Sequence, residues 1–152
     1  MSVHPGDRGV SSMQFVETAN KIEERAMQVC RKWPKSYTFI ITQRTIQLAS
    51  ELYEHVLKAN CIFPITTEAE REERLLELQR ALGANNSFSR KIERAYHMFP
   101  ICGIRNKLSR TETDEKSDRI LAEFMNLCLI EEDAIKGNIT FTRNCKLAGK
   151  KQ

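Results

Sequence analysis

The chain has 152 residues and a mass of 17.6 kDa, the size of a single domain, which excludes a multi-domain enzyme. Hydrophobic residues make up 41% and charged residues 29%, a composition too apolar for disorder, and no stretch approaches the roughly 18 apolar residues of a membrane span. The net charge of +4 is small for the length, so its meaning depends on where the charges lie.

Apolar residues recur at helical spacing, whereas no long segment alternates with the period of two that a strand shows. The first predicted helix runs from about Met13 to Lys32, is capped by Ser11 or Ser12, and ends before Pro34. Its apolar residues are spaced three or four apart, as in a helix packed lengthwise against neighbours. They are Phe15, Ala19, Ile22, Ala26, Val29 and Trp33.

The second predicted helix runs from about Ser36 to Phe63 and is closed by Pro64. Its apolar stripe consists of Ile46, Ala49, Leu52, Tyr53, Val56, Ala59 and Phe63. Five further apolar residues lie outside this stripe, and their exposure on a monomer would form an unusually large apolar patch. They are Phe39, Ile40, Ile41, Leu48 and Leu57. We therefore expect a cyclic homo-oligomer.

The third predicted helix opens with a capping box, in which Thr67 and Glu70 satisfy each other's backbone amides. It continues to about Phe99. Residues 83–86, which begin with a glycine, weaken its middle. The apolar spacing stays in phase across them, through Leu75, Leu78, Leu82, Ile92 and Ala95. We therefore expect one helix rather than two.

The last predicted helix is clear from Asp114, although its start is uncertain, and Gly137 suits the position just past its C-terminus. We expect residues 1–12 to be flexible, residues 13–137 to form the domain, and residues 138–152 to be a basic, frayed tail. Four long helices joined by short turns pack most simply as an antiparallel up-down-up-down four-helix bundle, so the expected fold class is all-α.

Neither the cysteines nor the N-terminus indicates secretion. The five cysteines are odd in number, lie at least 17 residues apart and form no Cys-x-x-Cys pair, so a zinc site or redox dithiol has no local support. They are Cys30, Cys61, Cys102, Cys128 and Cys145. Residues 1–10 contain no apolar core of a signal peptide. We expect buried free thiols in a cytoplasmic protein.

The chain also lacks the patterns of catalytic and metal sites. No Glu-x-x-His is present, and the two pairs at a spacing of four, Glu51 with His55 and Glu93 with His97, are expected to be solvated surface pairs. Glycine-rich phosphate loops and nucleophile elbows are absent. We expect no metal, no cofactor and no enzymatic activity.

Basic residues are concentrated in a few segments. Residues 90–110 carry six basic side chains against the single Glu93, whereas residues 36–89 and 111–130 are acidic overall. The candidate nucleic-acid or partner-binding residues are Lys32, Lys35, Arg44, Arg90, Lys91, Arg94, Arg105, Lys107 and Arg110. The alternative is a solvated face with weak surface ion pairs. The interleaved aromatic residues Trp33, Tyr37 and Phe39 are expected to pack in the core and turn rather than to stack on bases.

The turn at 32–39 and the positions that follow it resemble a family of small bacterial and phage four-helix-bundle proteins. The residues that carry the resemblance are KWPKSYTF at 32–39, Gln43-Arg44, Ala59-Asn60, Glu73-Arg74-Leu75, Leu78, Ala81, Phe99-Pro100 and Ile135-Lys136-Gly137. The family includes the accessory variability determinant (Avd) of diversity-generating retroelements and is related to proteins encoded in ribosomal RNA intervening sequences. The likeness covers about residues 13–137 and is a pattern of turns and apolar positions.

The resemblance implies a homopentamer with a positively charged surface. It further implies a non-enzymatic accessory protein that binds the element's reverse transcriptase and nucleic acid, either template RNA or complementary DNA, and supports mutagenic reverse transcription. The Gly-Gly-Trp ending of many relatives is replaced here by Ile135-Lys136-Gly137, which leaves open a cousin with another partner. The alternative function is a structural or protein-interaction bundle with no nucleic-acid role.

Overall fold

The computed structural model describes residues 5–98 and 110–147, and in this part of the chain the regular secondary structure is entirely helical. Four α-helices follow one another: α1 (Pro5–Cys30), α2 (Gln43–Cys61), α3 (Glu68–Met98) and α4 (Arg110–Asn144). A short 3₁₀ helix η1 (Lys35–Tyr37) and a π-helical turn η2 (Thr38–Thr42) connect α1 to α2. The expected all-α four-helix fold is confirmed.

Helix α1 begins at Pro5, eight residues before the predicted start at Met13, so residues 5–12 are helical rather than a separate flexible segment. Proline at the first helical position explains this start, because its missing N–H is one that a helix leaves without an intrahelical partner in any case. The predicted seam from Phe15 to Trp33 is buried at all six positions. This seam is the most accurate part of the sequence prediction.

Helix α2 is preceded by a wider, irregular turn than the sequence predicts. The segment from Lys35 to Thr42 is helical but has 3₁₀ and then π geometry, and regular α-helix starts only at Gln43. Ile41 points into the core from this turn. At the other end, the helix stops at Cys61, and Phe63 is exposed rather than part of the buried stripe.

Helix α3 is one uninterrupted helix, as predicted, and it passes through Gly83 without a break. A Cβ atom at Gly83 would meet nothing within 4 Å, so the glycine lies at an open position. The predicted capping box is present: the Glu70 amide donates to the Thr67 hydroxyl at 3.1 Å. Hydrogen bonds from the hydroxyls and backbone amides of Thr66 and Thr67 lower the pKa of Glu70.

Helix α4 continues seven residues past the predicted stop at Gly137, so residues 138–144 are helical rather than a frayed tail. The glycine is exposed, and its cost of about 1 kcal/mol within a helix is modest. Beyond it, Ile139 and Thr142 are buried against the other helices. The free energy gained by burying these two side chains exceeds the cost of the glycine, so the helix continues past it.

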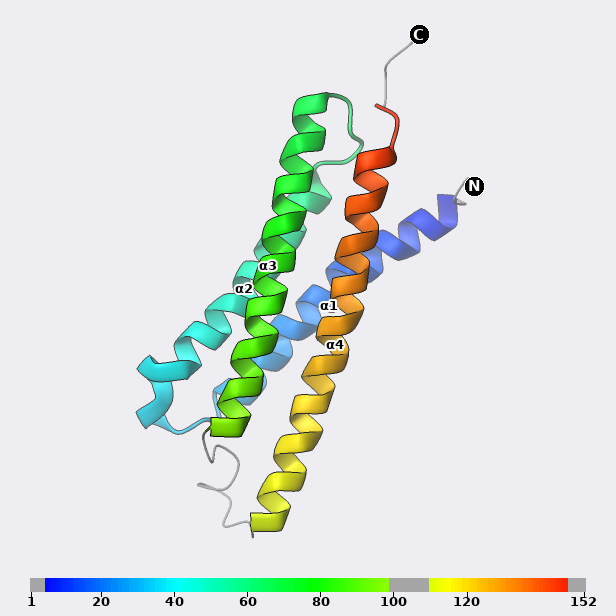
Figure 1. The fold of residues 1–152 in the computed structure, drawn as a ribbon. Helices are drawn as coiled ribbons and strands as arrows, with labels where there is room; N and C mark the ends of the chain where they lie inside the picture. Colours follow the sequence, from blue (N-terminus) through cyan, green and yellow to red (C-terminus); the bar gives the residue numbers. More distant parts are fainter. Residues whose placement is uncertain (1–4, 99–109, 148–152) are drawn as a thin grey trace.

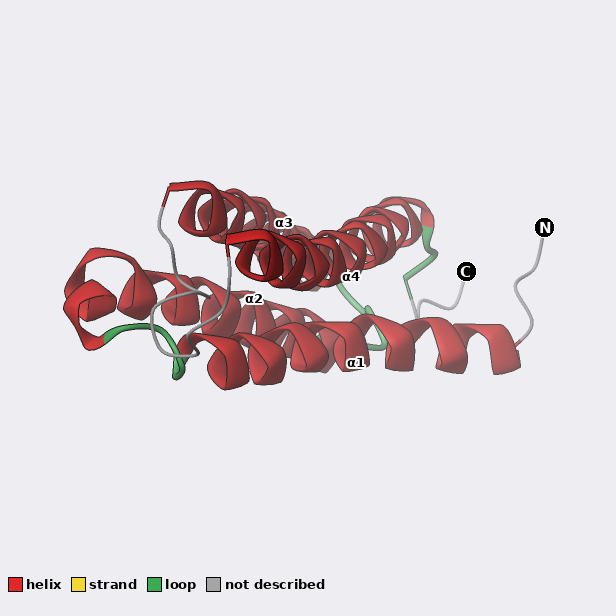
Figure 2. Cartoon of the chain, turned by 90° about the horizontal axis from the view of Figure 1, so that it is seen from below, coloured by secondary structure: helices red, strands yellow, loops and turns green. Residues whose placement is uncertain are grey.

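The helices form two layers, α1 beside α2 and α3 beside α4 (Figures 1 and 2). Side-chain contacts show that α3 and α4 run antiparallel: Arg74 contacts Thr142, whereas Phe88, farther along α3, contacts Phe124, earlier in α4. Helices α2 and α3 are also antiparallel: Arg74 bonds the Ala59 carbonyl, whereas Glu77, farther along α3, contacts His55, earlier in α2. Helix α1 contacts both α2 and α4. None of the helices in the described residues combines the length and the apolar character that a membrane span needs.

Candidate nucleic-acid interface

The structure places most of the nine predicted site residues on three elements. Lys32 and Lys35 lie in the turn after α1, Arg44 lies in the first turn of α2, and three more residues lie near the end of α3. Those on α3 are Arg90, Lys91 and Arg94. Arg110 is the first residue of α4, but its side chain, like Arg105 and Lys107 as whole residues, lies outside the described part of the structure.

An aromatic contact brings the α1–α2 turn to the end of α3. The rings of Trp33 and Tyr96 meet edge to face with their centroids 5.8 Å apart, and both side chains are buried. The turn and the last residues of α3 therefore lie at the same end of the bundle, which is the lower end in Figure 1. Tyr37 also packs against the core, so the expectation of packing is confirmed for Trp33 and Tyr37.

Five basic residues at this end of the bundle, which we call the basic end, are not engaged with acids. They are Lys32, Lys35, Arg90, Lys91 and Arg94. All are exposed except the half-buried Lys91, and within residues 5–98 and 110–147 none of them forms an ion pair. Six other basic residues do pair with carboxylates: Arg25, Arg44, Lys58, Arg71, Arg80 and Lys136. Arg31, which precedes Lys32, and residues far from this end, such as Lys21 and Lys146, also form no ion pair among the described residues.

Arg44 therefore differs from the other candidates. Its guanidinium lies 3.3 Å from the Glu51 carboxylate on the same helix, although both side chains are part-exposed. Such a surface pair contributes little stability and can open toward a stronger anionic partner. The sequence around it is unusual, since no acidic residue occurs between Glu24 and Glu51.

The start of α4 carries charge of the opposite sign. Glu112, Asp114 and Glu115 are exposed in its first two turns. This start lies at the same end of the molecule as the end of α3 (Figure 1). A polyanion at the basic end would therefore contact the α1–α2 turn and α3 rather than these three carboxylates.

Sequence reasoning missed a buried arginine at the opposite end. Arg74 is 4% exposed and donates to the Thr142 hydroxyl at 2.9 Å, to the Asn138 side-chain oxygen at 2.9 Å, and to the carbonyls of Ala59 and Ile62. These carbonyls end α2, where a helix leaves acceptors without intrahelical donors. Desolvation lowers the pKa of Arg74. Arg74 thus joins α2, α3 and α4.

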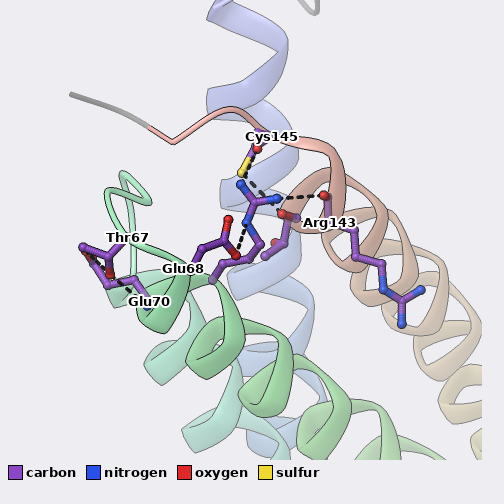
Figure 3. Close-up of polar contacts among 7 residues, drawn as sticks. Thr67, Glu68, Glu70, Arg143 and Cys145 are labelled. Atoms are coloured by element: carbon purple, nitrogen blue, oxygen red, sulfur yellow. Dashed lines mark hydrogen bonds and ion pairs between the residues drawn. The ribbon is translucent and has the colours of Figure 1, made fainter. Parts of the chain in front are cut away.

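Arg71, one turn earlier and largely buried, stabilises the same end of the bundle. Its guanidinium donates to the carbonyl oxygens of Arg143 at 2.9 Å and of Cys145 at 2.7 Å, and it pairs with Glu68 at 3.5 Å (Figure 3). The acceptors belong to the C-terminal end of α4 and the residue just after it. Both arginines therefore serve as caps of other helices.

A buried acid is the second feature that the sequence analysis missed. Glu131 is 0% exposed, and neither carboxylate oxygen has a hydrogen-bond partner in the described structure. Burial raises its pKa to about 8. One turn away, the backbone carbonyl of Cys128 accepts a bond from the Asn85 amide at 2.9 Å, and the Asn85 oxygen is also without a partner among the described residues. The sequence does contain a sign of this burial, because Glu131 falls at helical spacing with the apolar residues Phe124, Cys128 and Ile135.

The expectation for His55 was wrong. Its Nδ1 lies 2.6 Å from the Glu77 carboxylate of α3, in a part-buried contact, and not beside Glu51. Burial raises the pKa of Glu77, but the hydrogen bond from His55 and the charges of His55, Arg80 and Lys58 outweigh it, so the pKa is lowered. The pair joins α2 to α3. The described residues contain no cluster of three or more metal-ligating side chains.

The thiols are only partly as expected. Cys30 and Cys128 are buried, and burial raises the pKa of each to about 12, whereas Cys61 is exposed and Cys145 is half-buried. Cys102 lies outside the described residues. At such a pKa the two buried thiols are protonated and act as apolar packing groups.

A shallow groove of about 290 Å³ runs between α1 and α4. Arg25 and Glu123 bridge it with a two-pronged ion pair at 2.8 and 3.2 Å, and Lys21 and Glu24 also line it. Because its charges balance, the groove is a weaker anion site than the basic end.

Comparison of the chain with protein-family models, with curated proteins and with solved structures finds no match.

Proposed function

We propose that the protein is a non-enzymatic accessory bundle that binds nucleic acid through its basic end. The observation that supports this proposal is the meeting, at one end of the fold, of five cations that form no ion pair with an acid of the described residues. Unpaired lysine and arginine side chains can neutralise phosphates of a nucleic acid. The cations that were condensed on those phosphates are then released, and their release drives binding. Arg44, with its weak surface pair, extends this surface onto α2.

The finer proposal is that the protein serves a diversity-generating retroelement. On this proposal it binds the reverse transcriptase together with template RNA or complementary DNA, and it works as a homopentamer in the cytoplasm. The sequence resemblance at residues 32–39 and the later turns supports this partner. The competing function, a protein-interaction bundle without nucleic acid, is favoured by the exposed apolar residues on the outer faces, such as Leu76 and Leu129.

Charge reversal at the end of α3 tests the nucleic-acid proposal. Replacing Arg90, Lys91 and Arg94 with glutamate should weaken binding to an oligonucleotide by about tenfold or more, because three attractions to phosphate become repulsions. The slope of log affinity against log salt should also become shallower, by about 0.9 for each duplex phosphate that is no longer neutralised or about 0.7 for a single strand. Fluorescence anisotropy at two salt concentrations measures both quantities.

The matched control makes the same change in net charge at the opposite end, by replacing Lys58, Lys136 and Lys146 with glutamate. We expect it to reduce affinity much less, since it weakens only long-range attraction. Oligonucleotides of equal length and different sequence should bind alike, because no base-reading motif is present in the sequence. Equal reductions in the two triple variants, or no binding by the native protein at low salt, would contradict the proposal.

The assembly can be tested separately. Two of the five extra apolar residues on the second helix, Ile41 and Leu48, are buried within the monomer, so the apolar surface is smaller than the sequence suggests. Phe39, Ile40 and Leu57 remain exposed. Light scattering should give five times the chain mass of 17.6 kDa if the homopentamer forms. A stable monomer at micromolar concentration would count against it.

A further inference from the structure

The π-helical turn η2 holds an aromatic ring in solvent. Phe39 is 90% exposed and Ile40 is 61% exposed, whereas Ile41 turns inward and is buried. The expectation that Phe39 packs in the turn was therefore wrong. The chain buries the nearby Trp33 but leaves these two consecutive large apolar side chains in water. Such exposure indicates a surface that another molecule covers.

The chain on both sides of this ring is rich in positive charge. Lys35 is exposed four residues before Phe39, and the exposed Arg44 follows five residues after it. Lys32 and Arg31 precede them, both exposed, and the whole stretch between Glu24 and Glu51 contains no acid. The ring is thus flanked by cations in the chain on both sides. An occupant of this surface should combine a flat apolar group with negative charge.

We propose that Phe39 is a stacking platform for an unpaired base, so that the ligand of the basic end is single-stranded nucleic acid. The inference rests on the proposed function and specifies its ligand. Single-strand binding sites combine a positively charged track for the backbone with aromatic rings on which bases stack. Lys32 and Lys35, both exposed, precede the ring in the chain and supply positive charge, and the exposed Ile40 follows it directly. A base in a duplex is already stacked on its neighbours and is not available to Phe39.

A second copy of the chain fits this surface less well. A stable protein interface needs about 20 to 30 residues on each side, and the turn offers two exposed apolar side chains among cations. Stacking of one base needs a single ring. The positive charge also matches phosphate, whereas a protein partner would need an acidic patch of its own.

Removal of the ring tests the inference. Phe39→Ala should weaken binding to a thymine homopolymer about tenfold, the equivalent of about 1.4 kcal/mol for the removal of one stack. It should change affinity for a duplex of equal length less than about twofold, because a duplex presents no free base face. The salt slope should stay unchanged, since no charge is removed. Leu129→Ala, which trims another exposed apolar side chain on α4, should leave both affinities unchanged.

Phe39→Trp provides a direct readout. The only native tryptophan, Trp33, is 4% exposed, so the introduced side chain reports from solvent. Its fluorescence should be quenched on addition of the single strand, with affinity equal to or above the native value, and should change little with the duplex. Light scattering on each variant shows whether assembly is unchanged.

The failures of the two proposals are distinguishable. If Phe39→Ala binds the single strand as tightly as the native protein does, the stacking inference is overturned and the basic end stands. If the native protein binds neither nucleic acid, both proposals fail. If Phe39→Ala changes the oligomeric state, a second copy of the chain covers the Phe39 side chain, and the stacking inference is overturned.

Discussion

Replacing Arg74 with methionine should destabilise the folded protein by about 3 kcal/mol. Methionine fills much of the space of the arginine stem but donates no hydrogen bond. The carbonyls of Ala59 and Ile62 and the side-chain oxygens of Asn138 and Thr142 would each lose the guanidinium as a donor inside the bundle. Relief from burying a charge offsets part of this cost, but several orphaned acceptors cost more than one desolvated guanidinium whose three nitrogens all donate hydrogen bonds.

Urea unfolding followed by circular dichroism, at one fixed protein concentration, measures the change. Arg90→Met is the matched control, because Arg90 lies on the same helix, is exposed and has no ion pair in the described structure. We expect it to alter the free energy of unfolding by less than about 0.5 kcal/mol. Equal effects of the two substitutions would show that Arg74 does not join the three helices as described.

The fold could be predicted from the sequence where apolar spacing alone decides the structure. The seam of α1, from Phe15 to Trp33, is correct because each of its positions is apolar. The prediction failed where a local signal was outweighed. Gly137 indicates a helix end, yet the burial of Ile139 and Thr142 beyond it carries α4 to Asn144. A glycine within a helix costs about 1 kcal/mol, and the free energy gained by burying these side chains exceeds that cost.

Buried polar residues could not be predicted in the same way, because hydropathy assigns arginine and glutamate to the surface. Arg74 is buried because the end of α2 needs donors, a requirement that exists only once α2 and α3 are packed. The candidate site shows the same limit. Spacing finds Arg90, Lys91 and Arg94 on one helix, but only the contact of Trp33 with Tyr96 places the α1–α2 turn beside them. The exposure of Phe39 follows from the π-helical geometry of η2, which no sequence pattern indicated.

Glu131 makes the stability of the bundle depend on pH. Burial raises its pKa from the ordinary 4.5 to about 8, and the described structure gives its oxygens no partner. The folded chain therefore holds this proton more tightly than the unfolded chain does. As pH rises from about 4.5 to about 8, the unfolded chain releases the proton first, so the stability contribution of this group is fully present below 4.5 and is lost across that interval.

Glu131→Gln should remove this dependence, because the amide stays neutral at every pH in the interval. At pH 8 we expect the variant to be more stable than the native protein by about 4 kcal/mol, and near pH 4.5 the two should be nearly equal. The measurement is the difference in the free energy of unfolding between variant and native protein at several pH values. Taking this difference cancels the contributions of other titrating groups such as the His55–Glu77 pair.

Glu132→Gln is the control, because Glu132 is ion-paired with Lys136 at the surface. Its removal should cost less than about 1 kcal/mol, with little change over the interval. A stability gain in Glu131→Gln that is the same at pH 5 and pH 8 would show that the carboxyl is not protonated in the core.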